Sequence, residues 1–189
     1  MKILVFSDLH GDIPIYKKIS QNYFSKVDQI WCLGDIFYNY RQGIESQEIA
    51  DKLIEIMNND TLPKSLFVLG NCENFLDCSK FKYTMNGNTS VIKEIDGLKI
   101  LLNHGTNLKT LSERLHILKT NNCPILLYGH SHKYELSFVQ GCYLFNPGSP
   151  SYPGNKYRIP TVMLIDTKAH KFELVDIISE NAIETITLK

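Results

Sequence analysis

The sequence is organised around five short apolar segments, each followed by an Asp, Asn or His that in four cases stands directly beside a glycine. The segments have the length of β-strands and comprise residues 2–7, 29–33, 65–69, 98–102 and 124–128. The polar groups after them are Asp8-Leu9-His10, Gly34-Asp35, Gly70-Asn71, Asn103-His104-Gly105 and Gly129-His130-Ser131-His132. In open α/β sheets, ligands bind beyond the carboxyl ends of the strands. If the five strands lie side by side, their tips form one site.

The segments between these strands predict an α/β fold. Apolar side chains recur with helical spacing over residues 13–24 and 44–57, and residues 108–120 also predict a helix. Strands that alternate with helices are typical of parallel βαβ units. Asp96-Gly97 predicts a hairpin between residues 89–95 and 98–103.

The second half of the chain is richer in short strands, which we predict at residues 134–139, 142–145, 160–166 and 171–178. A parallel first half and a β-rich second half fit two mixed β-sheets that lie between helices. We expect residues 1–189 to form a single domain, because no linker or internal repeat interrupts them.

Charge and composition exclude several classes of protein. Lys and Arg number 20, as do Asp and Glu, so a nucleic-acid polymer is not an expected partner. Apolar residues make up 43% of the chain, which excludes a disordered protein, and no apolar segment reaches the length of a membrane span. Asp8 interrupts the apolar start too early for a signal peptide. The odd number of cysteines and the lack of a C-x-x-C pair fit a reducing compartment, so we expect a cytoplasmic protein.

The polar residues at the strand tips have the composition of a two-metal site. They supply four imidazoles, two carboxylates and one amide oxygen, from Asp8, His10, Asp35, Asn71, His104, His130 and His132. Seven ligands exceed the needs of one tetrahedral zinc and suit two adjacent ions. Nitrogen and oxygen donors without thiolate favour Mn, Fe, Ni or Zn over Cu(I). Two ions about 3.5–4 Å apart can hold a hydroxide and a phosphoryl group for in-line attack.

Each element of this set also has a structural interpretation. Asp8 alone could cap a helix, Gly34-Asp35 could be a turn, and His104 could be a buried, hydrogen-bonded histidine. The pairs Asp8-x-His10 and His130-x-His132 are more specific, because residues two apart on an extended chain point to one side. We assign structural roles to the two other histidines, His116 and His170.

In this order, the motifs resemble those of the calcineurin-like metallophosphoesterase superfamily: D-x-H, G-D, G-N-[HC]-[DE], H and G-H-x-H. Asn146-Pro147-Gly148-Ser149 and the short chain resemble the small bacterial and archaeal phosphodiesterases of the YfcE type. The resemblance covers roughly residues 1–165 and implies an αββα sandwich of the metallo-dependent phosphatase type. It also implies that Asp35 bridges two ions. The other ligands would be Asp8, His10 and His132 for the first ion and Asn71, His104 and His130 for the second.

The resemblance implies a phosphodiesterase that hydrolyses small phosphodiesters through a hydroxide bridging two divalent ions. Mn²⁺ is the expected metal, with Ni²⁺, Zn²⁺, Fe²⁺ and Co²⁺ as alternatives, and the expected catalytic residues are Asp35, Asn71, Cys72 and His104. Two positions depart from many relatives. Cys72 replaces a histidine and is either a weak proton donor or a small half-buried residue. Thr106 stands where the branch often has a second histidine.

Residues around these motifs are weaker candidates. Arg41, beside Asn39 and Tyr40, could bind phosphate, and Asp12 could orient a histidine or cap a helix. Glu73 and Asn74 could support the ligands, and Tyr152, Lys156 and Tyr157 could line a cleft. Exposed aromatic side chains could form a homo-oligomer contact, from Phe37, Tyr38 and Tyr40. The two tyrosines could instead cover the site. We expect Asn146-Pro147-Gly148 to form a turn.

Two other functions compete with the phosphodiesterase. A non-catalytic scaffold of the same fold would bind proteins, as the retromer subunit of this fold does, but it has no need of all seven ligand positions. A nuclease acting on a polymer is disfavoured by the zero net charge.

Overall fold

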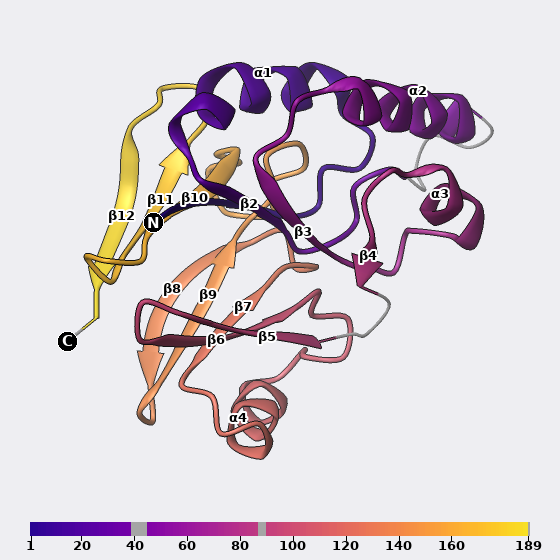
Figure 1. Cartoon of the computed structure of the whole chain (residues 1–189). Coiled ribbons are helices and arrows are strands. Elements are labelled where there is room, and N and C mark those ends of the chain that lie inside the picture. Colours follow the sequence, from indigo (N-terminus) through magenta and orange to yellow (C-terminus); the bar gives the residue numbers. More distant parts are fainter. Residues whose placement is uncertain (39–44, 87–89, 189) are drawn as a thin grey trace.

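Two β-sheets face each other across a shared apolar core in the computed structural model, which describes residues 1–38, 45–86 and 90–188 (Figure 1). The first sheet has the strand order β12-β11-β10-β1-β2-β3-β4. Its strands are β1 (Lys2–Phe6), β2 (Gln29–Cys32), β3 (Lys64–Val68), β4 (Met85–Asn86), β10 (Thr161–Asp166), β11 (Lys171–Asp176) and β12 (Ala182–Thr187). The second sheet has the order β5-β6-β7-β9-β8. Its strands are β5 (Ser90–Ile95), β6 (Leu98–Asn103), β7 (Ile125–Tyr128), β8 (Tyr134–Val139) and β9 (Cys142–Pro147).

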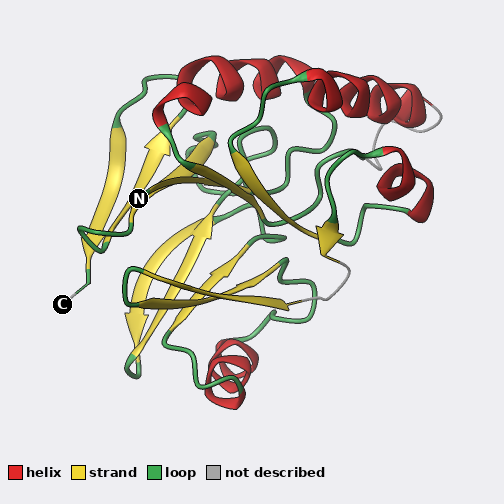
Figure 2. Ribbon diagram, in the orientation of Figure 1, coloured by secondary structure: helices red, strands yellow, loops and turns green. Residues whose placement is uncertain are grey.

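Helices cover the outer face of each sheet (Figure 2). Helices α1 (Ile13–Tyr23), which continues into the 3₁₀ turn η1 (Phe24–Lys26), and α2 (Glu45–Asn59) pack on the first sheet, with the short α3 (Phe75–Lys80) nearby. Helix α4 (Leu111–Thr120) packs on the second sheet through Leu118. Both sheets combine parallel and antiparallel pairs, so the predicted αββα sandwich of two mixed sheets is confirmed. No helix in the described ranges combines the length and the apolar character that crossing a bilayer requires.

Burial on both faces explains why the sequences of the strands are continuously apolar. In β1, Leu4 and Phe6 pack under the helices, whereas Ile3 and Val5 pack against the second sheet. Successive side chains of a strand point to opposite faces, and in this strand both faces are covered. The strand therefore shows no alternation of apolar and polar residues.

The structure corrects the expected arrangement of the five strands. They do not lie side by side: β1, β2 and β3 belong to the first sheet, whereas β6 and β7 belong to the second. The β5–β6 hairpin begins the second sheet, and the chain returns to the first sheet when β10 pairs antiparallel with β1. Strands that are apolar on both faces carry no mark of the sheet to which they belong.

Several local predictions also differ from the structure. Sequence patterns missed β4, β12 and α3, and Asn146 and Pro147 end strand β9 instead of forming a turn. Phe37 and Tyr38 are not exposed aromatics, because both side chains are buried in the core beneath the helices. Tyr40 lies outside the described residues. The expected oligomer surface is therefore not formed by Phe37 and Tyr38.

The two sheets are in close contact where β1 and β7 end. A β-carbon added at Gly129, after β7, would overlap Oγ of Ser7 and lie 2.8 Å from the Cβ of Ser7, after β1. Real Cβ atoms do not come this close, so Gly129 permits the contact between the sheets.

We expect Gly129→Ala to lower the free energy of unfolding by about 1–3 kcal/mol, because the new methyl group forces the strand tips apart. Urea denaturation measures the change. Ser7→Gly alone is the control, because it removes the overlapped side chain without adding a methyl group. Ser7→Gly combined with Gly129→Ala should recover part of the loss, and no recovery would contradict the overlap as its cause.

Candidate metal centre

The seven predicted ligands meet where the tips of the two sheets come together. The first sheet supplies Asp8 and His10 after β1, Asp35 after β2 and Asn71 after β3. The second sheet supplies His104 after β6, and His130 and His132 after β7. Their ligand atoms form two groups, Asp8–His10–His132 and Asp35–His104–His130, and Asn71 Oδ1 lies 3.0 Å from His104 Nε2. The seven residues of the strand-tip prediction therefore lie together, although they come from two sheets.

Five of these residues have left-handed backbone, which corrects the assumption of an extended chain. The φ angles of Asp8, His10, Asp35, His130 and His132 lie between 50° and 65°, a region that non-glycine residues seldom occupy. Hydrogen bonds hold the turns, from Asp8 N–H to Gly34 O (3.0 Å) and from His10 N–H to Asp35 O (2.9 Å). Backbone of this kind is found at functional sites, where the surrounding structure compensates its cost.

Backbone carbonyls fix the orientation of three imidazoles. His10 Nδ1 lies 2.6 Å from Tyr38 O, His104 Nδ1 lies 2.8 Å from Leu33 O, and His132 Nδ1 lies 2.8 Å from Tyr152 O. A carbonyl only accepts, so each Nδ1 donates its proton outward and each neutral ring turns the Nε2 lone pair inward. This is the arrangement found around metal-binding histidines. Main-chain partners leave no side-chain signal, so the sequence could not reveal them.

In the first group, imidazole nitrogen lone pairs and a carboxylate oxygen lie close together, which suits a bound cation. His10 Nε2 and His132 Nε2 are 3.1 Å apart, and His132 Nε2 is 3.5 Å from Asp8 Oδ1. In the described part of the chain, Asp8 Oδ1 is buried without a hydrogen-bond partner. Burial raises the pKa of Asp8 to about 7, which reflects the poor solvation of this carboxylate. A divalent ion would satisfy this oxygen and both lone pairs at once.

The second group is centred on Asp35. Its Oδ2 lies 3.3 Å from His104 Nε2 and 3.9 Å from His10 Nε2, so one carboxylate faces both groups. Burial opposes ionisation of each partner, but their hydrogen bond and mutual attraction outweigh it. They lower the pKa of Asp35 and raise that of His104 to about 9. A divalent ion between these residues would take the place of the proton on His104 Nε2.

Cys72 supports Asp35 from the side away from solvent. Its backbone N–H donates to Asp35 Oδ1 over 2.9 Å, and its thiol donates to Asp35 Oδ2 over 3.2 Å. The side chain is buried, and burial followed by the charge of Asp35 raises the pKa of the thiol. The neutral thiol expected from the sequence is therefore a hydrogen-bond donor to Asp35.

Glu73 and Asn74 support the ligand loops, as expected. Glu73 accepts backbone N–H groups of Asp35 (3.1 Å), Ile36 (2.5 Å) and Gly70 (2.7 Å). It thereby fastens the loop after β2 to the loop after β3. Asn74 caps α3 and donates to the hydroxyl of Tyr38 over 2.6 Å, the residue whose carbonyl orients His10.

The remaining predictions separate into structural residues and residues near the centre. Asp12 caps α1 by accepting from Ile15 N–H over 3.0 Å. His116 is exposed on α4, and His170 bonds to Asp96 O over 3.0 Å, as their structural assignment predicted. Thr106 Oγ1 lies 3.3 Å from Asn71 Oδ1, at the edge of the second group. Asn39, Tyr40 and Arg41 lie outside the described residues.

Two supporting residues were missed because their segment was interpreted as a turn. Asn146 is fully buried and donates to Gly129 O (3.0 Å) and Ser131 Oγ (3.1 Å). Ser149 donates to Asp8 O over 2.7 Å. Both residues therefore join the end of β9 to the ligand loops, and their only signal in the sequence was Asn146-Pro147-Gly148-Ser149.

A hollow of about 620 Å³ adjoins the first group. It is lined by Ser131, His132, Ser151, Tyr152, Pro153, Gly154, Asn155 and Arg158. Tyr152 thus lines a cleft as predicted, whereas Lys156 and Tyr157 are not part of this lining. The Tyr152 ring also meets the His10 ring edge-on, with 5.8 Å between their centroids.

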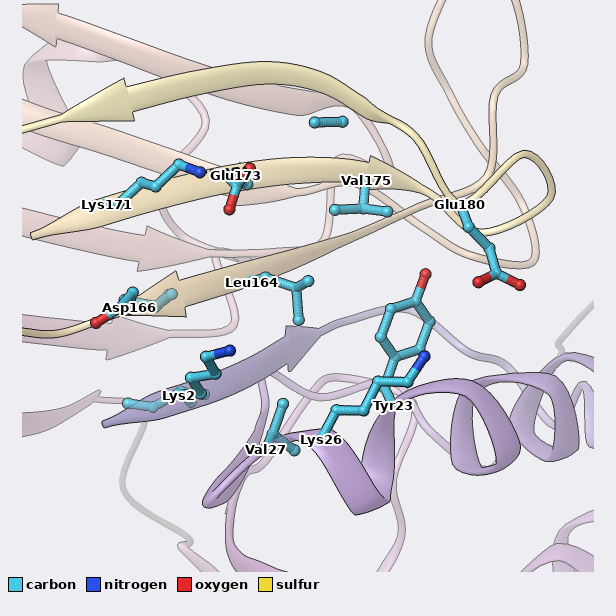
Figure 3. Close-up of a pocket in the computed structure, with 13 residues that line it drawn as sticks. Lys2, Tyr23, Lys26, Val27, Leu164, Asp166, Lys171, Glu173, Val175 and Glu180 are labelled. Carbon is cyan, nitrogen blue, oxygen red and sulfur yellow. Dashed lines mark ion pairs between the residues drawn. The ribbon is translucent and has the colours of Figure 1, made fainter. Parts of the chain in front are cut away.

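A second hollow, of about 470 Å³, lies at the amino end of β1 (Figure 3). Lys2, Tyr23 and Glu180 are among the residues around it, and its Lys171 and Glu173 form an ion pair of 2.9 Å. None of the seven candidate ligands lines it. The chemistry suggested by the metal ligands therefore belongs to the first hollow.

Comparisons with known proteins concern the family and the fold of the chain. Residues 1–170 match the model of the calcineurin-like phosphoesterase superfamily domain. Phosphodiesterase YfcE of Escherichia coli K12 is 26% identical over 160 residues, which are 81% of each chain. The solved structure of the E. coli phosphoesterase Yfce has a TM-score of 0.75 at 20% identity and covers both chains fully. Vps29 of Entamoeba histolytica, solved with zinc, has a TM-score of 0.65 at 21% identity over 98% of each chain. The two solved structures share the fold.

We expect Mn²⁺ or Zn²⁺ to raise the melting temperature of the wild-type protein, because an ion that binds only the folded state stabilises it. His132→Ala should remove most of this rise and weaken metal binding in calorimetric titration at least about tenfold. His116→Ala, which changes an exposed histidine on α4, is the matched control. An unchanged rise in the His132 variant would contradict the assignment of the first group.

We expect Cys72→Ala to weaken metal binding by roughly three- to tenfold, because Asp35 loses a hydrogen bond that orients it. Cys72→Ser keeps a donor and should bind metal nearly as well as the wild type. Titration of the metal-stripped variants provides the measurement. If Cys72→Ala binds metal normally, the contact to Asp35 has no positioning role.

Proposed function

Because the chain belongs to the calcineurin-like phosphoesterase superfamily, we propose that it is a metal-dependent phosphodiesterase that hydrolyses small phosphodiesters. The observation that carries this proposal is the set of inward-turned imidazoles around Asp8 and Asp35. Its similarity to a curated phosphodiesterase supports diesters as the substrate class. The zero net charge favours a small substrate over a nucleic-acid polymer. We keep the cytoplasm as the proposed compartment.

The proposed centre holds two divalent ions. The first would be bound by Asp8, His10, His132 and Asp35, and the second by Asp35, Asn71, His104 and His130. Mn²⁺ is our first choice, and this mixed nitrogen and oxygen set also suits Ni²⁺, Zn²⁺, Fe²⁺ and Co²⁺. When bound, the ions would acidify water for in-line attack on phosphorus and offset the charge of the phosphoryl oxygens.

The protein's own residues would orient the reaction. Asp35 faces both groups and is held by Cys72, so its carboxylate has a fixed place between the two ion positions. Asn71 is exposed at the rim, and among the described residues its amide nitrogen has one contact, 3.5 Å from Cys72 Sγ. We assign this amide to a phosphoryl oxygen of the substrate. His104 would hold the second ion in place through its bond to Leu33 O.

The second candidate function is a non-catalytic scaffold for protein–protein interaction. It is favoured by Phe75 and Leu76, which are 85% and 61% exposed at the start of α3. These apolar side chains follow directly after the loop that carries Asn71. The complete ligand set favours the enzyme, because a scaffold does not need buried carboxylates turned toward imidazoles.

The test is hydrolysis of bis(p-nitrophenyl) phosphate by metal-stripped protein supplied again with Mn²⁺. We expect metal-dependent release of nitrophenolate, and Asp35→Asn should reduce it more than about 100-fold because both ions lose a ligand. Asp166→Asn, at the opposite end of the sheet beside Lys2, is the matched control.

Folded protein that releases no nitrophenolate with Mn²⁺, Ni²⁺, Co²⁺ or Zn²⁺ would contradict the diesterase. Phosphomonoesters would then be tested, and after them the scaffold.

A further inference from the structure

The loop after β9 forms a wall beside the candidate metal centre and is fastened to it. Gly154 N–H donates to His132 O over 2.7 Å. A β-carbon at Gly154 would lie 3.1 Å from Ser131 O and 3.3 Å from His132 Cβ. His132 in turn bonds to the carbonyl of Tyr152. The hollow of about 620 Å³ therefore shares its wall with the first ligand group.

The same loop holds the backbone of Arg158 in one conformation. Asn155 closes the turn through two bonds to Ile159, one from Asn155 Nδ2 to Ile159 O (2.9 Å) and one from Ile159 N–H to Asn155 Oδ1 (3.0 Å). Arg158 N–H donates to Asn155 O over 3.1 Å, and its φ of 51° is left-handed. The arginine is thus presented on a closed turn.

The guanidinium of Arg158 differs from that of Arg114 in having no compensating charge among the described residues. It makes no ion pair or hydrogen bond within residues 1–38, 45–86 and 90–188, whereas Arg114 pairs with Glu135 at 3.5 Å and stacks on Tyr128. No carboxylate lines the hollow. Lys133 also lies close by, since its stem packs under Gly154. The hollow is cationic in a chain whose net charge is zero.

We propose that this hollow receives one ester group of the substrate, and that Arg158 selects ester groups that carry their own negative charge. This proposal rests on the proposed phosphodiesterase function. A second phosphate, as in an ester of a nucleoside bisphosphate, has this chemistry. A guanidinium binds phosphate through two parallel hydrogen bonds. The volume lies within the usual range for small-molecule sites, and the closed turn reduces the entropy lost on binding.

The test compares two substrates that differ by one phosphate. Thymidine 5′-(4-nitrophenyl phosphate) and its 3′-phosphorylated form both release 4-nitrophenolate when water adds to the 5′ phosphorus. With Mn²⁺ supplied, we expect the wild type to have the higher kcat/KM for the 3′-phosphorylated form. Arg158→Ala should reduce this preference by roughly tenfold or more, mainly through KM, and Arg158→Lys should keep part of it.

The matched control is Lys156→Ala, which removes an exposed cation of the same loop that does not line the hollow. Its preference should equal that of the wild type. An Arg158→Ala variant that hydrolyses both substrates with an unchanged preference would overturn the proposal. Equal loss of preference in both variants would also overturn it, because the effect would then come from the general charge of the loop.

A binding measurement separates this proposal from the proposed function. Calorimetry with thymidine 3′,5′-bisphosphate and thymidine 5′-phosphate gives an affinity ratio that does not depend on turnover. If neither nitrophenyl substrate is hydrolysed but the ratio still depends on Arg158, the diesterase is contradicted and the anion subsite is supported. A ratio that is the same in the wild type and in Arg158→Ala overturns the subsite.

Discussion

The contact between the two sheets at the ends of β1 and β7 is the constraint on which the centre depends. Gly129 lies against Ser7, and the N–H of His130 donates to Asp8 Oδ2 over 2.9 Å across the same boundary. The groups Asp8–His10–His132 and Asp35–His104–His130 each take residues from both sheets, so both depend on how the sheets are placed against each other. Any change that moves one sheet against the other alters both groups together.

The polar centre carries energetic costs that packing of the apolar core does not offset. Left-handed residues cost of the order of 1–3 kcal/mol each, and Asp8 Oδ1 has no hydrogen-bond partner in the described residues. Buried N–H donors, such as those that Glu73 accepts, fix the loops but do not neutralise the charge. An ion bound only in the folded state adds the missing stabilisation, so metal binding and folding are expected to be coupled in this protein.

The sequence predicted the chemistry of the centre better than its geometry. The seven candidate ligands could be selected because each follows a buried strand, and that position does not depend on which sheet the strand joins. The division between sheets was not predictable, since β1 and β7 are equally apolar on both faces. The carbonyls of Leu33, Tyr38 and Tyr152 were also invisible, because any residue offers the same carbonyl. Asn146 was misjudged because Asn, Pro and Gly favour turns, whereas here the strand continues through Pro147.

In the proposed function, the reaction and the choice of substrate depend on different parts of the chain. The ligands sit at strand tips, where the core fixes each backbone and a substitution disturbs both ion positions. Arg158 sits on a loop that contacts this frame through Ser149, the carbonyl of Tyr152 and Gly154. Its side chain is exposed and supports none of the ligands. The loop can therefore change the charge of the hollow without altering the ligand set, so relatives with the same ligands need not share a substrate.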